Sequence, residues 1–193
     1  MQFFLIFLFL FLSLSFPVYA HNFCNESFSF YSGFVHPFTG VDHLFVMVGV
    51  GLWAAHLGGR ALWVLPLSFI SAMLLGFVLA WSGIEMPFVE PLILLSMVTS
   101  GLLSAFLLRF STKLAMAIVL SFAIFHGYVH STACQAKELF SYSCGFSVAT
   151  ALLHLLGIFM SWVSHFLGSS WRDKITRVCG MLTFFAAFYM AFS

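Results

Sequence analysis

The amino-acid sequence predicts an all-α membrane protein, a bundle of six transmembrane helices that follows a cleaved signal peptide. Hydrophobic residues make up 62% of the 193 residues and charged residues only 7%, and the mean hydropathy is +1.08. A soluble domain of this size has more polar groups, because it must cover its surface with them. The apolar residues also form six segments of about the 20 residues that a helix needs to cross a bilayer. We therefore expect the lipid bilayer to surround most of the chain.

The first twenty residues have the composition of a secretory signal peptide. Residues 1–16 are rich in Phe and Leu, and Val18 and Ala20 are small residues at the −3 and −1 positions of a cleavage site. The segment has no basic residues at its start, so an uncleaved first transmembrane helix is the alternative. We expect cleavage after Ala20, which leaves residues 21–193 as one transmembrane domain with His21 at its N-terminus.

Six apolar segments follow in the mature chain. They cover residues 34–55, 61–82, 91–109, 114–131, 144–165 and 175–192. The breaks between them contain glycines, prolines and charges, which interrupt helices or stay in water. Within the second and third segments, small residues recur every four positions, a spacing that favours close helix packing. These small residues are Ala72, Gly76, Ala80, Ser96, Ser100 and Ser104, and we assign them packing roles only.

The basic residues predict how the bundle is inserted. If the mature chain starts outside, six of the seven Lys and Arg residues fall in inner loops and only Lys137 falls outside. The acidic residues Glu26, Glu85, Glu90 and Glu138 also fall outside. An excess of basic residues marks the cytoplasmic side, so we expect an inner-membrane protein with both mature termini in the periplasm. A net charge of +1 leaves no basic patch for a nucleic acid.

Histidines gather at the outer edges of two predicted spans. The two clusters read His36-Pro37-Phe38-Thr39-Gly40-Val41-Asp42-His43 and Phe125-His126-Gly127-Tyr128-Val129-His130. Ionisable groups are costly in hydrocarbon, so inside a span they indicate function. Imidazole and carboxylate groups without a ring of thiolates suit a borderline divalent cation such as Ni²⁺, Co²⁺ or Zn²⁺.

The spacing of the histidines bears on how they can bind a metal. His126 and His130 are four residues apart, so both rings project from one helix face and can share one ion. The alternative is a hydrogen-bonded pair between helices, without metal. His36 and His43 are about 10 Å apart along an ideal helix. One ion can reach both only if the helix is broken, and otherwise they mark two successive sites.

The local sequence favours such a break. Pro37 disfavours helical geometry at His36, and Gly40 permits an interruption. Asp42 is the only acid inside a predicted span. Its carboxylate is a metal ligand, an acceptor that fixes a ligand histidine, or a structural hydrogen-bond partner of a helix end.

Two further histidines are candidate ligands. His154 lies near the middle of the fifth span, on the helix face that carries Thr150. It is either a transient ligand or proton acceptor inside a pathway, or a core histidine bonded to a neighbouring helix. His21 precedes the first span on the same outer side. Cys24, Cys134 and Cys144 all fall in the oxidising compartment. Two of them can form a disulfide while the third stays free, and the sequence does not decide which pair forms.

The two histidine motifs resemble the signature motifs of the HupE/UreJ family, and further similarity runs through residues 51–55, 58–63 and 149–154. The resemblance implies a secondary permease for nickel, or cobalt in some lineages, linked to metal supply for hydrogenase, urease or cobalamin. It also implies that the motif residues matter for transport: His36, Asp42, His43, His126 and His130. The family's second motif continues with Gly-x-Glu, whereas Ser131 and Ala133 stand at these positions here.

Residues and resemblance together predict a transporter and not an enzyme. We rank Ni²⁺ first as its substrate, Co²⁺ second and Zn²⁺ third, and we expect no permanently bound cofactor. The ion is captured at the outer side by the motif residues, helped by His21, and then passes His154. The alternatives are a membrane-embedded zinc-dependent hydrolase built on the same His/Asp cluster and a bis-histidine haem protein. No sequence feature specifies an oligomeric state.

Overall fold

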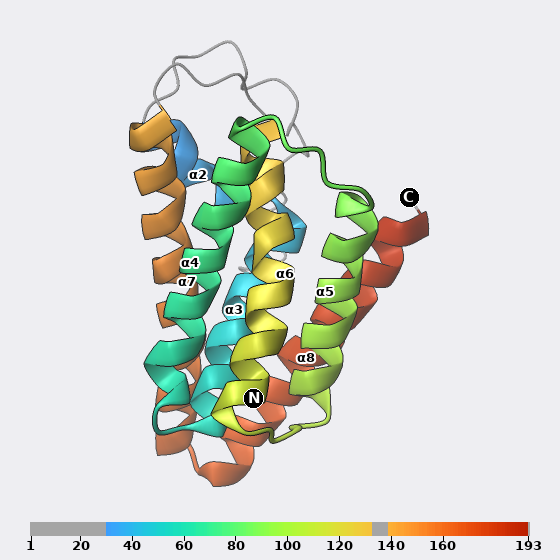
Figure 1. The fold of residues 1–193 in the computed structure, drawn as a ribbon. Coiled ribbons are helices and arrows are strands. Elements are labelled where there is room, and N and C mark those ends of the chain that lie inside the picture. The colour runs from blue at the N-terminus through green and yellow to red at the C-terminus, as the bar shows by residue number, and fades with distance from the viewer. Residues whose placement is uncertain (1–29, 133–138, 193) are drawn as a thin grey trace.

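The computed structural model describes residues 30–132 and 139–192, and every regular element within them is a helix (Figure 1). The helices are α2 (Phe30–Thr39), α3 (Val41–Leu57), α4 (Ala61–Trp81), α5 (Val89–Ala105), α6 (Thr112–Thr132), α7 (Leu139–Phe166) and α8 (Ser169–Phe192). The predicted all-α class is confirmed. The predicted signal peptide and His21 lie outside the described residues, as do Cys24, Cys134 and Glu138.

Four helices, α4, α6, α7 and α8, are long and apolar enough to cross a membrane. Helices α2 and α3 form a fifth apolar unit, bent by 83°. Helix α5 has 17 residues, at the lower limit of the roughly 17–25 residues that span a bilayer. Of the six predicted spans, four therefore correspond to helices of sufficient length. One corresponds to the broken α2–α3 unit, and one to the short helix α5. Large apolar side chains cover the outside, among them Trp63, Phe159 and Phe188.

The first predicted span is interrupted, but not where Pro37 was expected to act. His36 and Pro37 both lie inside α2, and the break falls at Gly40. Pro37 cannot donate a hydrogen bond to the carbonyl of Gly33, one turn earlier, and α2 ends only two residues after it. The hydroxyl of Thr39 donates a hydrogen bond to the carbonyl of His36 at 2.8 Å, which helps to close the helix end.

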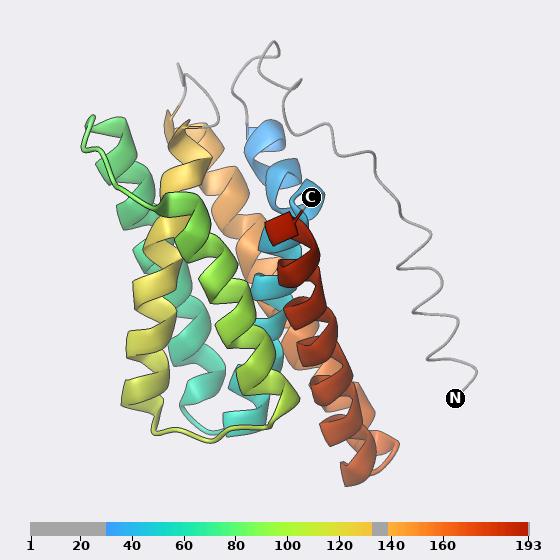
Figure 2. The ribbon, with the colours of Figure 1, turned by 90° about the vertical axis from the view of Figure 1, so that its right-hand side faces the viewer.

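Glycines set the helix pairs of the bundle. Where α4 meets α6, a methyl group on Gly127 would overlap the backbone of Met73, and one on Gly76 would overlap the backbone of Ile124. Glycines face the backbone of the partner helix in the same reciprocal way in three more pairs: Gly33 and Gly145 (α2 and α7), Gly51 and Gly157 (α3 and α7), and Gly101 and Gly180 (α5 and α8). Helices α5 and α8 lie side by side in both ribbon views (Figure 2). Close backbone approach through small residues is how helices associate in lipid.

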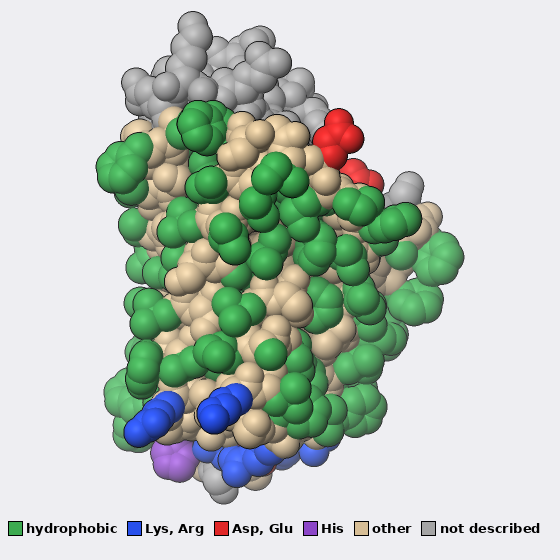
Figure 3. All heavy atoms as spheres, in the orientation of Figure 1, with side chains coloured by type: hydrophobic (Ala, Val, Ile, Leu, Met, Phe, Trp, Pro, Cys, Tyr) green, Lys and Arg blue, Asp and Glu red, His purple; other side chains and the backbone are tan. Residues whose placement is uncertain are grey.

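Charge is divided between the two ends of the bundle (Figure 3). Lys and Arg side chains gather at the end where α3 joins α4, α5 joins α6 and α8 begins, which we call the basic end. Its residues are Arg60, Arg109, Lys113, Arg172, Lys174 and Arg177. Acidic side chains lie near the opposite end. The predicted orientation in the membrane depends on this separation of basic and acidic residues. The orientation itself stays a prediction.

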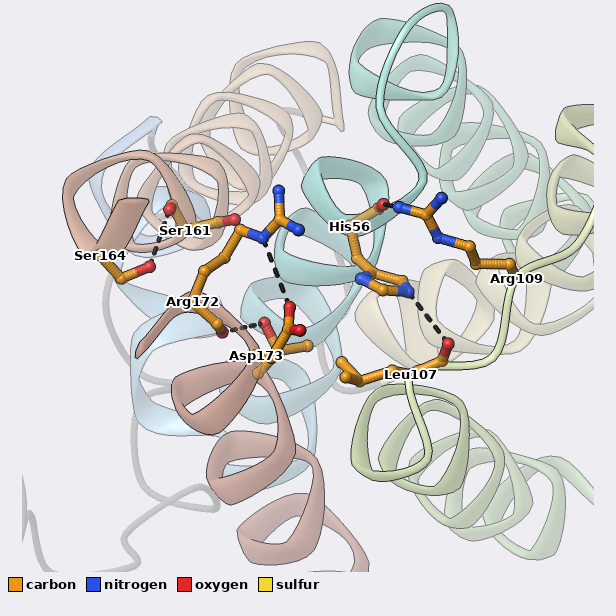
Figure 4. A network of polar contacts seen from close by, with 8 residues as sticks. His56, Leu107, Arg109, Ser161, Ser164, Arg172 and Asp173 are labelled. Atoms are coloured by element: carbon orange, nitrogen blue, oxygen red, sulfur yellow. Dashed lines mark hydrogen bonds and ion pairs between the residues drawn. The ribbon is translucent and has the colours of Figure 1, made fainter. Parts of the chain in front are cut away.

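Polar contacts tie the helices together at the basic end (Figure 4). Nε2 of His56 donates a hydrogen bond to the carbonyl of Leu107 at 3.0 Å, and the guanidinium of Arg109 donates to the carbonyl of His56 at 3.1 Å. Arg172 and Asp173 form an ion pair at 3.5 Å. The two hydrogen bonds satisfy one backbone carbonyl in the α5–α6 connection and one in the last turn of α3, where helical partners are missing. His56 thus has a structural role at this end.

Candidate metal centre

Four imidazole rings meet in the half of the bundle away from the basic end. They come from His36 on α2, His43 on α3, and His126 and His130 on α6, and we call them the histidine cluster. The ring of His130 lies 4.7 Å from that of His36 and 4.7 Å from that of His43, between centroids. The rings of His43 and His126 are 5.1 Å apart. The two sequence motifs therefore form one site.

The bend between α2 and α3 makes this convergence possible. On a straight helix, residues 36 and 43 would lie about 10 Å apart. With the chain turned by 83° at Gly40, the ring centroids of His36 and His43 are 5.7 Å apart. Of the two arrangements that the spacing allowed, the structure has the one in which both histidines share a site.

Three of the four rings are placed to hold one ion. One nitrogen from each of His36, His43 and His130 lies within 4.8 Å of the others. Tetrahedral nitrogen ligands at about 2.0–2.1 Å from a metal are about 3.4 Å apart. Small rotations of the rings are therefore enough to bring the three nitrogens into a coordination sphere.

Asp42 fixes the orientation of one of these rings. Its Oδ1 lies 2.9 Å from Nδ1 of His43. An ionised carboxylate has no proton to donate, so in a neutral ring it favours the proton on Nδ1 of His43 and the lone pair on Nε2. The contact is an ion pair by distance and does not have the geometry of a hydrogen bond. Nε2 is buried and has no hydrogen-bond partner among the described residues. This carboxylate–histidine arrangement is typical of metal sites.

The cluster buries unsatisfied ring nitrogens. His43 is 3% exposed, and His126 and His130 are 0% exposed. Within the described part of the chain, neither ring nitrogen of His130 has a hydrogen-bond partner. Its ring stacks on Phe146 of α7, with centroids 4.6 Å apart and planes at 14°. A buried polar atom without a partner costs about 1–3 kcal/mol, so an ion that binds these nitrogens removes a real penalty.

His154 lies deeper in the bundle and contacts α3. Its Nδ1 donates a hydrogen bond to the carbonyl of Met47 at 2.7 Å, which leaves Nε2 with its lone pair, buried and unpaired in the described residues. The ring of Phe69 contacts both His126 of the histidine cluster and His154, with ring centroids 5.7 Å and 5.1 Å away, respectively. His154 is thus bonded to a neighbouring helix and still keeps one free nitrogen.

The sequence did not indicate three residues that shape the site. Phe69 and Phe146 contact the histidine rings, but 27 residues of this chain are Phe, so composition does not distinguish them. Ser96, whose Oγ lies 2.8 Å from Nε2 of His126, was assigned to helix packing. The predicted role of His21 stays a prediction, because this residue lies outside the described part.

The model of the HupE / UreJ protein family matches residues 8–190 of this sequence. The chain belongs to the HupE/UreJ family. It is similar to Protein HupE of Rhizobium leguminosarum bv. viciae, with 43% identity over 128 residues that cover 66% of this chain and 67% of that protein. No solved structure matches the chain. Membership in the HupE/UreJ family confirms the resemblance, and with the apolar helices it identifies an integral membrane protein.

Replacement of Gly40 by alanine tests whether the bend needs a residue without a side chain. Its backbone is extended (φ −84°, ψ 116°), so alanine fits the conformation. The added methyl group, however, would lie 2.8 Å from Oδ1 of Asp42 and 3.1 Å from Nδ1 of His43. We expect Gly40→Ala to weaken nickel binding by about 10-fold, the lower end of the effect of disturbing a ligand's hydrogen-bond partner.

Equilibrium dialysis of purified protein against nickel measures this change. Gly49→Ala is the matched control, because a methyl group there meets nothing within 4 Å. Equal nickel affinity for Gly40→Ala, Gly49→Ala and the wild type would show that the space left by Gly40 is not needed to position the Asp42–His43 pair.

Proposed function

We propose that this HupE/UreJ protein is a permease that imports a divalent transition-metal ion, nickel first and cobalt second. The observation that carries the proposal is the convergence of one nitrogen each from His36, His43 and His130 within 4.8 Å, inside an apolar bundle. Buried imidazoles without partners are costly in hydrocarbon, and neutral imidazole is a good ligand for nickel and its neighbours in the first transition series. The choice of nickel and cobalt over zinc follows the family.

The roles we assign follow the geometry. His36, His43 and His130 bind the ion, and His126 is the fourth imidazole that can join them through its contact with His43. Asp42 lies beside Nδ1 of His43, orients that ring, and adds a negative charge that offsets part of the ion's charge. In this proposal the ion is cargo and not a resident cofactor.

The proposed direction of transport follows the charge asymmetry. Basic residues mark the cytoplasmic side, so the basic end faces inward and the histidine cluster lies in the periplasmic half. An ion that leaves the cluster meets Nε2 of His154 on its way inward, and His21 is proposed to assist capture outside. The membrane potential drives a dication inward with about 4.6 kcal/mol per 100 mV, twice the value for one charge.

Uptake of labelled nickel by cells that express the chain tests this proposal. We expect saturable uptake above that of empty-vector cells, with unlabelled cobalt competing better than zinc. His165→Ala is a suitable control variant, because His165 is an exposed residue at the far end of α7. The absence of uptake for nickel, cobalt and zinc alike would contradict the proposal.

A further inference from the structure

We propose that Ser96 is a positioning residue that keeps the proton of His126 on Nε2 and thereby presents Nδ1 to the metal ion. Ser96 lies on α5, outside both histidine motifs, and is 2% exposed. The inference rests on the proposed function, because it assigns a role to His126 in metal binding. The inference also gives a role at the metal site to helix α5, which contributes no ligand of its own to the histidine cluster.

The positions of the hydrogens follow from two distances. Oγ of Ser96 lies 2.6 Å from the carbonyl oxygen of Ile93 and 2.8 Å from Nε2 of His126. A carbonyl can only accept, and a serine hydroxyl has a single proton. That proton must point to Ile93, since two oxygens at 2.6 Å without a proton between them would repel each other. Oγ therefore accepts, and Nε2 of His126 must be the donor.

The second nitrogen of His126 is then left as a bare acceptor. A neutral imidazole carries one proton, so Nδ1 has the lone pair. Nδ1 is buried and has no hydrogen-bond partner within residues 30–132 and 139–192. Buried acceptors are nearly always satisfied, so this atom is the nitrogen that remains for an ion. The ring lies 5.1 Å from that of His43, next to the three ligands that converge.

Loss of the Ser96 oxygen would allow His126 to adopt both tautomers. In one of them the proton occupies the nitrogen that must bind the ion, so metal binding first requires rearrangement. Removing the hydrogen-bond partner of a ligand histidine typically lowers metal affinity by about 10- to 100-fold. We expect a loss in this range, with the helical bundle intact.

A simple Ser96→Ala change is not sufficient as a test. Ser96 and Ser100 both line a cavity of about 20 Å³ between α3, α4, α5 and α6, which has room for one water molecule. A water molecule that enters there can replace the missing hydroxyl. Ser96→Thr and Ser96→Val form a better pair, because the two side chains have nearly the same shape and only threonine has a hydroxyl.

The experiment compares these two variants with the wild type and with Ser100→Ala. Ser100 is one turn away on α5, and its hydroxyl donates to the carbonyl of Met97 at 3.2 Å, so it reproduces the local bond of Ser96 without a histidine. Nitrogen NMR of histidine-labelled protein in lipid, without metal, reports which nitrogen of His126 is protonated, with a His126→Gln spectrum to assign the signal. Equilibrium dialysis against nickel gives the affinity.

We expect the proton on Nε2 in the wild type, Ser96→Thr and Ser100→Ala, and a mixture of tautomers with about 10- to 100-fold weaker nickel binding in Ser96→Val. If the proton of His126 is on Nδ1 in the wild type, this result alone overturns the inference, and no variant is needed. Equal nickel affinity for Ser96→Thr and Ser96→Val also overturns it and leaves the proposed function standing. A wild type that binds no nickel overturns the proposed function instead, together with the metal-binding role of His126.

Discussion

Replacing His130 is expected to reduce nickel uptake by about 100-fold or more. His130 is the ring that contacts both His36 and His43, at 4.7 Å in each case. Changes in the partners of a ligand already lower affinity by about 10- to 100-fold, so loss of the ligand itself exceeds that range. Because His130 makes no hydrogen bond through its ring within the described residues, its removal leaves no other polar group unsatisfied.

Two variants separate metal binding from folding. His130→Ala removes the ring and leaves a cavity, whereas His130→Phe keeps an aromatic ring for the stack with Phe146 and lacks a ligand atom. Initial rates of labelled nickel uptake, at expression levels matched by immunoblot, give the result, with His165→Ala as the control. Uptake in His130→Phe within a few-fold of the wild type would refute the assignment of His130 as a ligand.

Replacing Gly127 with alanine is expected to lower the stability of the bundle and to abolish nickel binding with it. The added methyl group would overlap the backbone of Met73, and a backbone cannot move aside as a flexible side chain does. Helices α4 and α6 must separate, which costs about 1–3 kcal/mol or more. Since α6 carries His126 and His130, the separation also displaces two rings of the histidine cluster.

Thermal unfolding of the purified protein in detergent measures this effect, with nickel affinity as the second readout. Gly49→Ala again supplies the control, because it adds a methyl group to a helical glycine whose surroundings are open. We expect it to unfold at the wild-type temperature or slightly above, since alanine favours a helix more than glycine does. If Gly127→Ala unfolded at the same temperature as Gly49→Ala, close contact between α4 and α6 would not be essential.

The fold class and the metal site differ in how much of each the sequence reveals. Apolar segments bounded by charged or glycine-rich turns directly determine where helices form in a membrane, so the α class and most helix positions were predictable. The length of α5 was not predictable, because residues 106–108 are as apolar as a span but lie beyond the end of the helix. There the backbone turns through Leu107, at a φ of 53°, and its carbonyls are bound by side chains of α3.

The histidine motifs were predictable because ionisable residues stand out in an apolar chain. The sequence left open whether His36 and His43 share a site, since this depends on the angle at Gly40, which packing of α2 against α7 determines. Ser96 was not predictable as a partner of His126, because its spacing matches that of Ser100 and Ser104 on the same helix. Only the position of α5 relative to α6 distinguishes the three serines.

Nickel flux into vesicles reconstituted with the purified protein distinguishes transport from retention. With an inside-negative potential, the proposed permease admits many nickel ions per chain, at a rate that saturates with nickel and rises with the potential. The His130→Phe variant in the same vesicles loses this flux. Binding of one nickel ion per chain, with no entry above that of protein-free vesicles, would contradict the proposal and would identify a protein that holds its metal.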